Sequence, residues 1–235
     1  MKSLYKYKIA ELERKIEIMG IRPLDVLVVG ATGAGKSTTL NSFFQKYVAK
    51  VGVGVDPETM DVFDYELNDY IRFWDTPGLG DNINNDLEHS KLIIDMLNKS
   101  YKVDDKIYGF IDIVLLIVDA TSRDLGTAYK ILKELIVDQI QEDRILVAVN
   151  QADMAMKGRN WDYDKNLPNI KLVKFLEQQT HSVQRRIYEA TGVNIPMPIY
   201  YSAKYNYGVK KLYDFILENF PKERRKFLFK KKQIA

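Results

Sequence analysis

A glycine-rich octapeptide near the start of the chain has the residue types and spacing that hold a phosphate chain. It reads Gly-Ala-Thr-Gly-Ala-Gly-Lys-Ser from Gly30 to Ser37 and matches the pattern G-x-x-x-x-G-K-[ST]. An apolar run precedes it and a helical pattern follows, so backbone N–H groups converge where a helix begins and an anion is favoured. The predicted nucleotide-binding residues here are Gly30, Ala31, Thr32, Gly33, Ala34, Gly35, Lys36, Ser37 and Thr38.

Two members of this loop are expected to take a direct part in chemistry. Lys36 supplies a positive charge to the β- and γ-phosphates, and the Ser37 hydroxyl is a ligand for Mg²⁺. Because the loop then neutralises charge on the phosphate oxygens while water attacks, we assign Lys36 a catalytic role.

A second motif, Asp-Thr-Pro-Gly from Asp75 to Gly78, follows another apolar run. Asp75 is predicted to hold Mg²⁺ through a water, and Gly78 to bring its N–H to the γ-phosphate, since no side chain blocks the approach. Thr59 lies in the preceding loop, 48–60, and is predicted to be a further Mg²⁺ ligand. The alternative for Thr59 is a hydroxyl at the start of a strand with no metal role. The catalytic candidates are thus Lys36, Thr59 and Gly78, and the metal candidates are Ser37, Thr59 and Asp75.

Two further motifs could read a nucleobase. Asn-Gln-Ala-Asp from Asn150 to Asp153 follows a predicted strand, and Ser-Ala-Lys from Ser202 to Lys204 follows the next one. The Asp153 carboxylate can accept hydrogen bonds from the N1–H and 2-amino groups of guanine, whereas adenine would leave it unpaired. Sites of this kind discriminate by ~10⁴-fold. The Ala203 N–H can meet the guanine O6. The predicted base-binding residues are Asn150, Gln151, Asp153, Ser202, Ala203 and Lys204.

Strand and helix patterns alternate along the chain and must position these loops. Apolar runs predict strands at 24–29, 111–118, 145–149 and 199–201. Helical spacing predicts helices at 4–19, 36–47, 87–98, 126–141, 170–191 and 209–219. Alternation on both sides of Asn68-Asp69 predicts a hairpin of 61–67 and 70–74. This order is typical of an α/β three-layer sandwich with a mostly parallel sheet and one antiparallel edge strand, which binds ligands at the carboxyl ends of its strands.

The composition excludes several classes of protein. An apolar share of 46% with 29% charged residues is that of a folded chain and not of a disordered one. The absence of cysteine excludes disulfides, thiolate metal sites and cysteine nucleophiles. The longest apolar stretch, 111–120, is far shorter than the ~20 residues of a membrane span, and the first residues show no signal-peptide core. We therefore expect a cytoplasmic, reduced environment.

Charge is distributed unevenly. Residues 221–235 hold seven Lys or Arg against one Glu, although the whole chain has a net charge of only +3. We expect an N-terminal amphipathic helix in 1–22, the nucleotide-binding domain in 23–220 and a basic tail in 221–235. The tail either contacts an anionic surface, RNA (including the ribosome) or an anionic membrane, or is a solvated terminus.

These motifs together resemble the Era-like branch of the translation-factor-class P-loop GTPases. The details at 30–37, 74–81 and 150–153 look most like the bacterial YeeP/YfjP-type GTPases. The resemblance covers residues 24 to about 220. It implies a Ras-like P-loop GTPase fold, GTP and GDP as ligands, Mg²⁺ as cofactor, GTP hydrolysis, and two switch loops around 51–60 and 77–89.

The chain departs from the family pattern at three positions. Gln151 replaces the lysine that normally covers the base, so nucleotide affinity is expected to be weaker while guanine selection continues through Asp153. Leu79 stands where Ras-like members have a water-orienting glutamine, and Gly33 where potassium-activated relatives have an asparagine. Intrinsic hydrolysis is therefore expected at or below the ~10⁻⁴ s⁻¹ of unassisted relatives.

Two functions follow from these features. One is a GTP/GDP conformational switch with slow Mg²⁺-dependent hydrolysis. The other is a nucleotide-gated assembly protein, septin- or dynamin-like, which uses the switch face as a homodimer surface. Near the loops, we interpret His89 as a solvated residue of its helix and not as a base. Trp161 we interpret as local packing and not as a partner contact.

Overall fold

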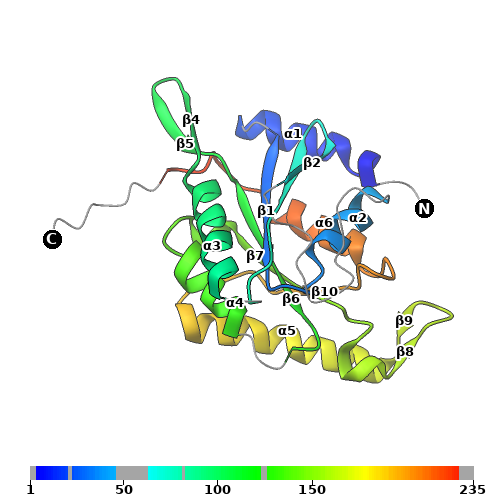
Figure 1. Cartoon of the computed structure of the whole chain (residues 1–235). Helices are drawn as coiled ribbons and strands as arrows, with labels where there is room; N and C mark the ends of the chain where they lie inside the picture. Colours follow the sequence, from blue (N-terminus) through cyan, green and yellow to red (C-terminus); the bar gives the residue numbers. More distant parts are fainter. Residues whose placement is uncertain (1–3, 21–22, 46–62, 81–82, 123–125, 228–235) are drawn as a thin grey trace.

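The computed structural model describes residues 4–20, 23–45, 63–80, 83–122 and 126–227. A six-stranded sheet runs through them in the order β10-β7-β6-β1-β3-β2 (Figure 1). The strands are β1 (Leu24–Gly30), β2 (Phe63–Asn68), β3 (Ile71–Asp75), β6 (Ile113–Asp119), β7 (Ile145–Asn150) and β10 (Ile199–Tyr200). Neighbouring strands pair in parallel except for β2 with β3, so the predicted antiparallel edge strand is confirmed.

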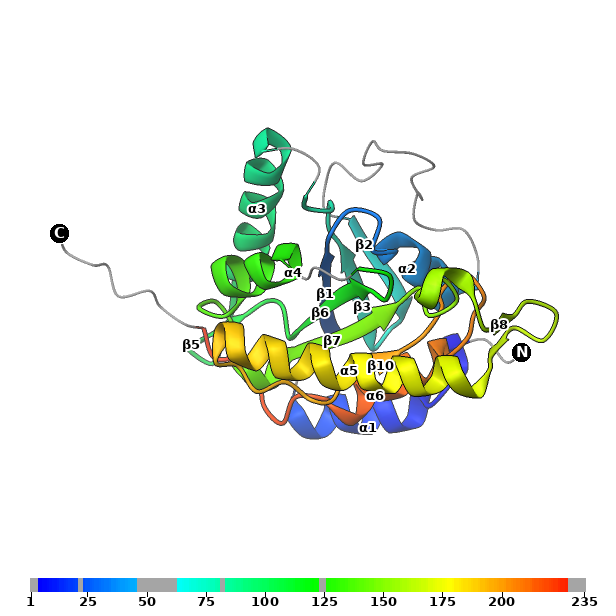
Figure 2. The same ribbon diagram turned by 90° about the horizontal axis from the view of Figure 1, so that it is seen from below.

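Helices cover both faces of this sheet (Figures 1 and 2). One layer contains α1 (Ile9–Met19), α2 (Lys36–Phe44) and α6 (Val209–Glu218). The other contains α3 (Ile83–Asn98), α4 (Gly126–Lys130) and α5 (Ile170–Thr191). The central strands β1 and β7 are buried along their whole length, as their continuous apolar runs predict. The three-layer sandwich is therefore confirmed.

The N-terminal helix packs on the domain. Leu12 of α1 is fully buried in the same apolar cluster as α2 and α6. The hydroxyl of Tyr7 donates a hydrogen bond to the Asp214 carboxylate of α6 at 3.0 Å. Gly20 ends α1 with a left-handed φ of 58°, the conformation that favours glycine at a helix C-terminus. No helix in the described ranges is long and apolar enough to cross a lipid bilayer.

Several short elements were not predicted. Two hairpins project from the sheet in Figure 1, β4 (Ser100–Val103) with β5 (Lys106–Gly109), and β8 (Trp161–Asp162) with β9 (Leu167–Pro168). Single turns of 3₁₀-helix occur at η1 (Leu4–Lys6), η3 (Glu142–Arg144) and η4 (Ala155–Gly158). The predicted helix 126–141 is helical as far as Ile136 and wrong beyond it. After α4 the chain widens into a π-helical turn, η2 (Ile131–Ile136), in which the Val137 N–H donates to the Leu132 carbonyl at 2.9 Å.

The first part of the basic C-terminal segment is built into the fold. Arg225 is fully buried and donates hydrogen bonds to the carbonyls of Leu97, at 2.7 Å, and Gln139, at 2.9 Å. Its backbone carbonyl accepts from the Gly109 N–H at 2.9 Å. A Cβ at Gly109 would lie 2.0 Å from the Arg225 guanidinium, so only glycine leaves room. Arg225 therefore supports the fold and is removed from the charge that the segment can present to a partner.

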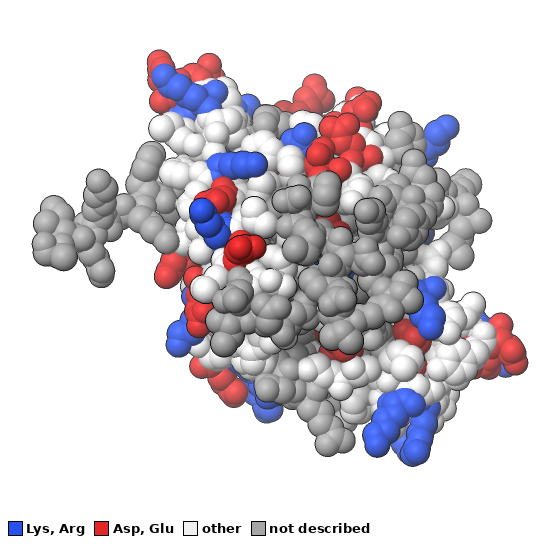
Figure 3. Space-filling view, in the orientation of Figure 1, with Lys and Arg blue, Asp and Glu red and all other residues white. Residues whose placement is uncertain are grey.

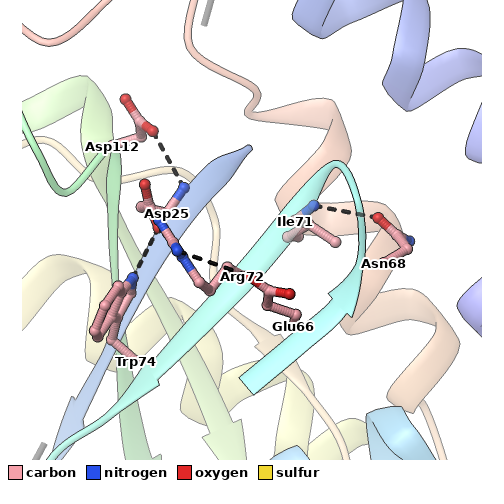
Figure 4. Close-up of polar contacts among 7 residues, drawn as sticks. All are labelled: Asp25, Glu66, Asn68, Ile71, Arg72, Trp74 and Asp112. Carbon is pink, nitrogen blue, oxygen red and sulfur yellow. Dashed lines mark hydrogen bonds and ion pairs between the residues drawn. The ribbon is translucent and has the colours of Figure 1, made fainter. Parts of the chain in front are cut away.

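A buried polar network joins the amino ends of the neighbouring strands β1, β3 and β6 (Figure 4). The Asp25 side chain is fully buried and accepts from Arg72 Nε at 2.7 Å and from Trp74 Nε1 at 2.8 Å. Its backbone N–H donates to Asp112 Oδ2 at 3.1 Å. The hydrogen bond from Arg72 to Asp25 raises the pKa of Arg72. The network thus gives the buried Asp25 carboxylate its hydrogen-bond partners at the amino ends of the strands, opposite the end that carries the predicted nucleotide loops.

We expect Asp25→Asn to lower the free energy of unfolding by about 2 kcal/mol, because it removes the buried carboxylate that accepts from Arg72 Nε and leaves the guanidinium with the more distant, exposed Glu66. The matched control is Glu66→Gln. Glu66 is the exposed carboxylate that faces the same Arg72 at 3.7 Å, and its loss should cost less than about 0.5 kcal/mol. Urea unfolding of both variants measures the difference. An equal loss of unfolding free energy in the two variants would show that the buried Arg72–Asp25 pair is no more stabilising than the exposed Arg72–Glu66 pair.

Candidate nucleotide-binding site

The predicted phosphate loop lies between β1 and α2. Gly30 ends β1, and a Cβ there would lie 2.5 Å from the Ile117 carbonyl oxygen. Gly35 precedes α2 with a left-handed φ of 89°, and a Cβ there would lie 2.3 Å from Asn150 Nδ2. Gly33 is left-handed as well, with φ 75°. These glycines let the loop curl tightly between two neighbouring strands, which is the backbone geometry that phosphate binding requires.

Lys36, Ser37 and Thr38 form the first turn of α2, as predicted. The Lys36 side chain is 7% exposed, and its Nζ donates to the carbonyls of Gly30 and Ala31 at 3.2 Å each. The ammonium group is therefore folded over the loop. In this position it lies beside the backbone N–H groups at the start of the helix, where a phosphate is favoured.

Ser37 and Asp75 meet at the base of the loop. Ser37 Oγ donates to Asp75 Oδ2 at 2.9 Å. Asp75 is 1% exposed, and within the described part of the chain its Oδ1 has no hydrogen-bond partner. Burial raises the pKa of Asp75, against the opposing effects of the Lys36 charge and the Ser37 hydrogen bond. An orphaned buried carboxylate oxygen beside a hydroxyl fits Mg²⁺, which would supply positive charge to the phosphate oxygens when bound.

We expect Asp75→Asn to raise the melting temperature of the protein in the absence of nucleotide and Mg²⁺. Because burial raises the pKa of Asp75, its ionisation destabilises the folded state as pH rises through that pKa, and the asparagine removes this cost. The advantage of the variant should be larger at pH 7 than at about pH 3, which lies below the ordinary pKa of an aspartate, so that the carboxyl group is mostly protonated in both the folded and the unfolded state. Melting curves at both pH values measure it, with the exposed Asp95→Asn as control. A variant less stable than the parent protein at pH 7 would contradict the prediction.

The Asn150 side chain connects the loop after β7 to the phosphate loop and to the loop that contains Ala203. It ends β7, and its Nδ2 donates to the Ala34 carbonyl at 3.0 Å while its Oδ1 accepts from the Ala203 N–H at 3.1 Å. The Ala203 N–H, predicted to face a guanine O6, is therefore held by Asn150 in this structure. Both bonds are buried. One amide side chain thus fixes the distance between the phosphate loop and the two base loops.

The remaining residues of the base loops converge on the same place. Asp153 is 1% exposed, and its Oδ1 accepts from Ser202 Oγ at 2.6 Å. Gln151 has a left-handed φ of 62°, and its Nε2 donates to the Gly33 carbonyl at 2.6 Å. The exposed Lys204 lies with its Nζ 5.3 Å from the Tyr205 ring centre. The structure therefore brings together the phosphate and base residues that the motifs predict.

Gly78 lies directly against the phosphate loop. A Cβ at Gly78 would lie 2.4 Å from Thr32 Oγ1 and 2.6 Å from Thr32 Cα, so a side chain is excluded. The Thr32 N–H donates to the Leu79 carbonyl at 2.9 Å, and Ala31 and Leu79 form a parallel bridge. The Leu79 side chain is 2% exposed and belongs to the hydrophobic core. Thr59, the third Mg²⁺ candidate, lies outside the described residues.

The interpretation of His89 as solvated is wrong. His89 is 2% exposed, and its Nδ1 lies 2.7 Å from the Gly78 carbonyl oxygen. It shares a buried face of α3 with Ile93 and Met96, four and seven residues later. That helical spacing could have identified His89 as a core-facing residue from the sequence.

Two buried aromatic side chains complete the surroundings of the base loops. Trp161 is 6% exposed and packs edge-on against Tyr207, with ring centres 5.4 Å apart, so its interpretation as local packing is confirmed. Tyr201, which the sequence analysis did not single out, is fully buried, and its hydroxyl lies 2.7 Å from Thr39 Oγ1 of α2. Burial raises the pKa of Tyr201, so its hydroxyl stays protonated and can bridge β10 to the phosphate-loop helix.

Residues 25–151, more than half of the chain, match the family described as 50S ribosome-binding GTPase. The chain belongs to this GTPase family. The match contains the phosphate loop, the Asp75–Gly78 motif and Asn150. The expected Ras-like P-loop GTPase fold is therefore confirmed, whereas the finer likeness to YeeP/YfjP-type GTPases stays a prediction.

Among curated proteins, Translocase of chloroplast 101 of Physcomitrium patens is 28% identical over 173 residues. The match covers 71% of this chain but 18% of that protein, so the chain spans about a fifth of its relative's length. The crystal structure of Toc33 from Arabidopsis thaliana with GDP and Mg²⁺ superposes with a TM-score of 0.63 at 16% identity and covers 95% of both chains. A structure of the chloroplast translocon components atToc33 and psToc159, for which dimerization is important for GTPase activity, gives a TM-score of 0.58 at 18% identity. It covers 89% of this chain and 90% of that one.

Proposed function

We propose that this chain binds GTP and GDP with Mg²⁺ and hydrolyses GTP, changing conformation between the two nucleotide states. One observation carries the proposal: side-chain hydrogen bonds from Asn150 and Gln151 join the phosphate loop to the loop that would read guanine. Toc33 binds GDP and Mg²⁺ on the same fold, which supports the same ligands here. In the GTP state the γ-phosphate would order Gly78, and hydrolysis would release it.

We further propose that hydrolysis by the isolated chain is slow. The residue after Gly78 is the apolar Leu79, and its side chain is buried in the core, so it does not orient water. Gly33 provides no side chain to hold a monovalent cation in the phosphate loop. Lys36 and the loop N–H groups would then stabilise the transferring phosphate only in part, and a partner or a second copy would supply the remaining transition-state stabilisation.

Calorimetry with GTP, GDP and ATP in the presence of Mg²⁺, followed by a turnover assay, tests the proposal. We expect binding of both guanine nucleotides, at least about 10³-fold weaker binding of ATP, and GTP turnover at or below ~10⁻⁴ s⁻¹. ATP bound as tightly as GTP would overturn the proposal. Fast turnover by a monomer would overturn the slow-hydrolysis part alone.

A homodimer is the second proposal, because a dimer supports GTPase activity in atToc33 and psToc159. The switch face, which carries Gly78 and α3, would meet its copy and supply the missing transition-state stabilisation, as in a nucleotide-gated assembly protein. Light scattering of the protein with GDP and with a non-hydrolysable GTP analogue measures the mass. A monomer in both states at high concentration, with turnover independent of protein concentration, would contradict this proposal.

Contact between the C-terminal segment and RNA, the ribosome or an anionic membrane is a third proposal. With Arg225 buried, six basic residues of the segment are left: Lys222, Arg224 and Lys226, whose side chain is 71% exposed, in the described part, and Lys230, Lys231 and Lys232 in the sequence beyond. On the face shown in Figure 3, basic and acidic side chains are interspersed over the described surface. RNA or vesicle binding that falls steeply with salt and is lost on truncation after Phe227 would support this contact. Binding unchanged by truncation would exclude it.

A further inference from the structure

The buried His89 holds the peptide that faces the phosphate loop. Its Nδ1 lies 2.7 Å from the Gly78 carbonyl oxygen, and the contact is fully enclosed. A carbonyl oxygen can only accept a hydrogen bond, so the proton of this bond belongs to Nδ1 and the imidazole is the donor. The tautomer of His89 is thereby set by Gly78.

The same stretch of backbone is held from its other side by the phosphate loop. Gly78 is in close contact with Thr32, Thr32 donates its N–H to Leu79, and the Leu79 N–H points to the Gly30 carbonyl at 3.5 Å. The Gly78–Leu79 peptide therefore has its carbonyl directed to α3 and its N–H directed to the phosphate loop. Without the bond from His89, the orientation of this peptide would depend on the long 3.5 Å contact between the Leu79 N–H and the Gly30 carbonyl and would be less restricted.

His89 is itself anchored in a rigid part of the fold. It lies on α3 in line with the buried Ile93 and Met96. The last turn of the same helix is held by Arg225, which donates to the Leu97 carbonyl at 2.7 Å and is fully buried. The imidazole position is therefore determined by the packing of α3 and not by the loop it contacts.

From this geometry we infer that His89 is a positioning residue for GTP: by holding the Gly78 carbonyl it fixes the backbone of Gly78, so that the N–H of Gly78, which belongs to the preceding Pro77–Gly78 peptide, faces a γ-phosphate. The inference rests on the proposed function. Because only the triphosphate has a γ-phosphate, His89 acts on GTP recognition and leaves GDP recognition, which uses the rest of the site, unchanged.

Affinities of the variants for GDP and for a non-hydrolysable GTP analogue, with Mg²⁺, test the inference. His89→Leu substitutes an apolar side chain of similar size that has no hydrogen-bond donor. It should weaken binding of the analogue about 10- to 100-fold, the effect of losing one hydrogen bond to a charged group. GDP affinity should change by less than about 2-fold. His89→Asn can place an amide N–H near the position of Nδ1 and should restore most of the loss. His181→Leu, at the exposed histidine of α5, is the control and should change neither affinity.

The outcomes distinguish failure of the His89 inference from failure of the proposed function. Equal losses for GDP and the GTP analogue in His89→Leu, or failure of a folded His89→Asn to restore the analogue, would overturn the inference and leave the proposed function standing. Should His89→Leu not fold, His89→Ala, which also lacks the donor, takes its place: a selective loss of analogue binding that His89→Asn restores supports the inference, and unchanged analogue binding in His89→Ala overturns it. A parent protein that binds neither nucleotide would overturn the proposed function and the inference together.

Discussion

Asp153→Asn lowers the affinity for GTP and GDP by roughly 10²- to 10⁴-fold, because two hydrogen bonds to the guanine N1–H and 2-amino groups lose their charged acceptor. The carboxylate is 1% exposed and oriented by Ser202 Oγ at 2.6 Å, so water does not replace the lost acceptor. The substituted amide places an N–H where the base presents its 2-amino group, and two donors then face each other. Competition titrations with a fluorescent guanine nucleotide measure the loss.

Xanthosine nucleotides test whether the side chain at position 153 itself selects the base. They have an oxygen in place of the 2-amino group, so the side-chain N–H that Asp153→Asn introduces can donate to it, and their affinity should rise while that of guanine nucleotides falls. Asp164→Asn, at the exposed turn of the β8–β9 hairpin, is the control and should leave all affinities unchanged. Guanine binding that survives in Asp153→Asn would show that another group selects the base.

Lys36→Ala should lower kcat/KM for GTP by about 10³-fold, the effect of removing one transition-state charge donor. The Nζ lies over the phosphate loop, bonded to the Gly30 and Ala31 carbonyls at 3.2 Å, and needs little reorganisation to reach a phosphate. The 7% exposed side chain is already ordered, so its conformational entropy is not lost on binding. Single-turnover hydrolysis with protein in excess measures the rate.

Two comparisons show whether the Lys36 effect is electrostatic. Lys171→Ala, at the exposed start of α5, removes a lysine that is not among the predicted site residues and should not change turnover. Lys36→Arg keeps the charge, but its planar guanidinium fits the narrow loop poorly, so we expect it to recover little activity. Turnover in Lys36→Ala at the rate of the parent protein would exclude this loop as the catalytic phosphate site.

The order and type of the main elements follow from local sequence patterns. β1 and β7 are continuous apolar runs because both of their faces are covered, and such runs are visible without any partner. The β2–β3 turn is equally local, since Asn68 Oδ1 accepts from the N–H groups of Tyr70 and Ile71 at 3.0 and 3.2 Å. α5 has its predicted bounds because Asn169 caps it and Gly192 ends it.

Features that depend on distant contacts could not be predicted in this way. The β4–β5 hairpin is short and half exposed, and its position depends on Gly109 pairing with Arg225. Arg225 itself has the composition of a solvated tail. Its burial depends on the Leu97 and Gln139 carbonyls, which lie 128 and 86 residues away in the chain.

The sequence by itself predicted which residues bind phosphate and which read a base, because glycine, lysine and acidic side chains are required there by chemistry whatever surrounds them. Only the tertiary structure decided how the loops are held together: Asn150 reaches the phosphate loop 116 residues away, and His89 turns inward to Gly78. The physical reason is that a polar side chain can satisfy its hydrogen bonds with water or with a distant backbone group. The choice between them depends on burial, which emerges when the layers pack.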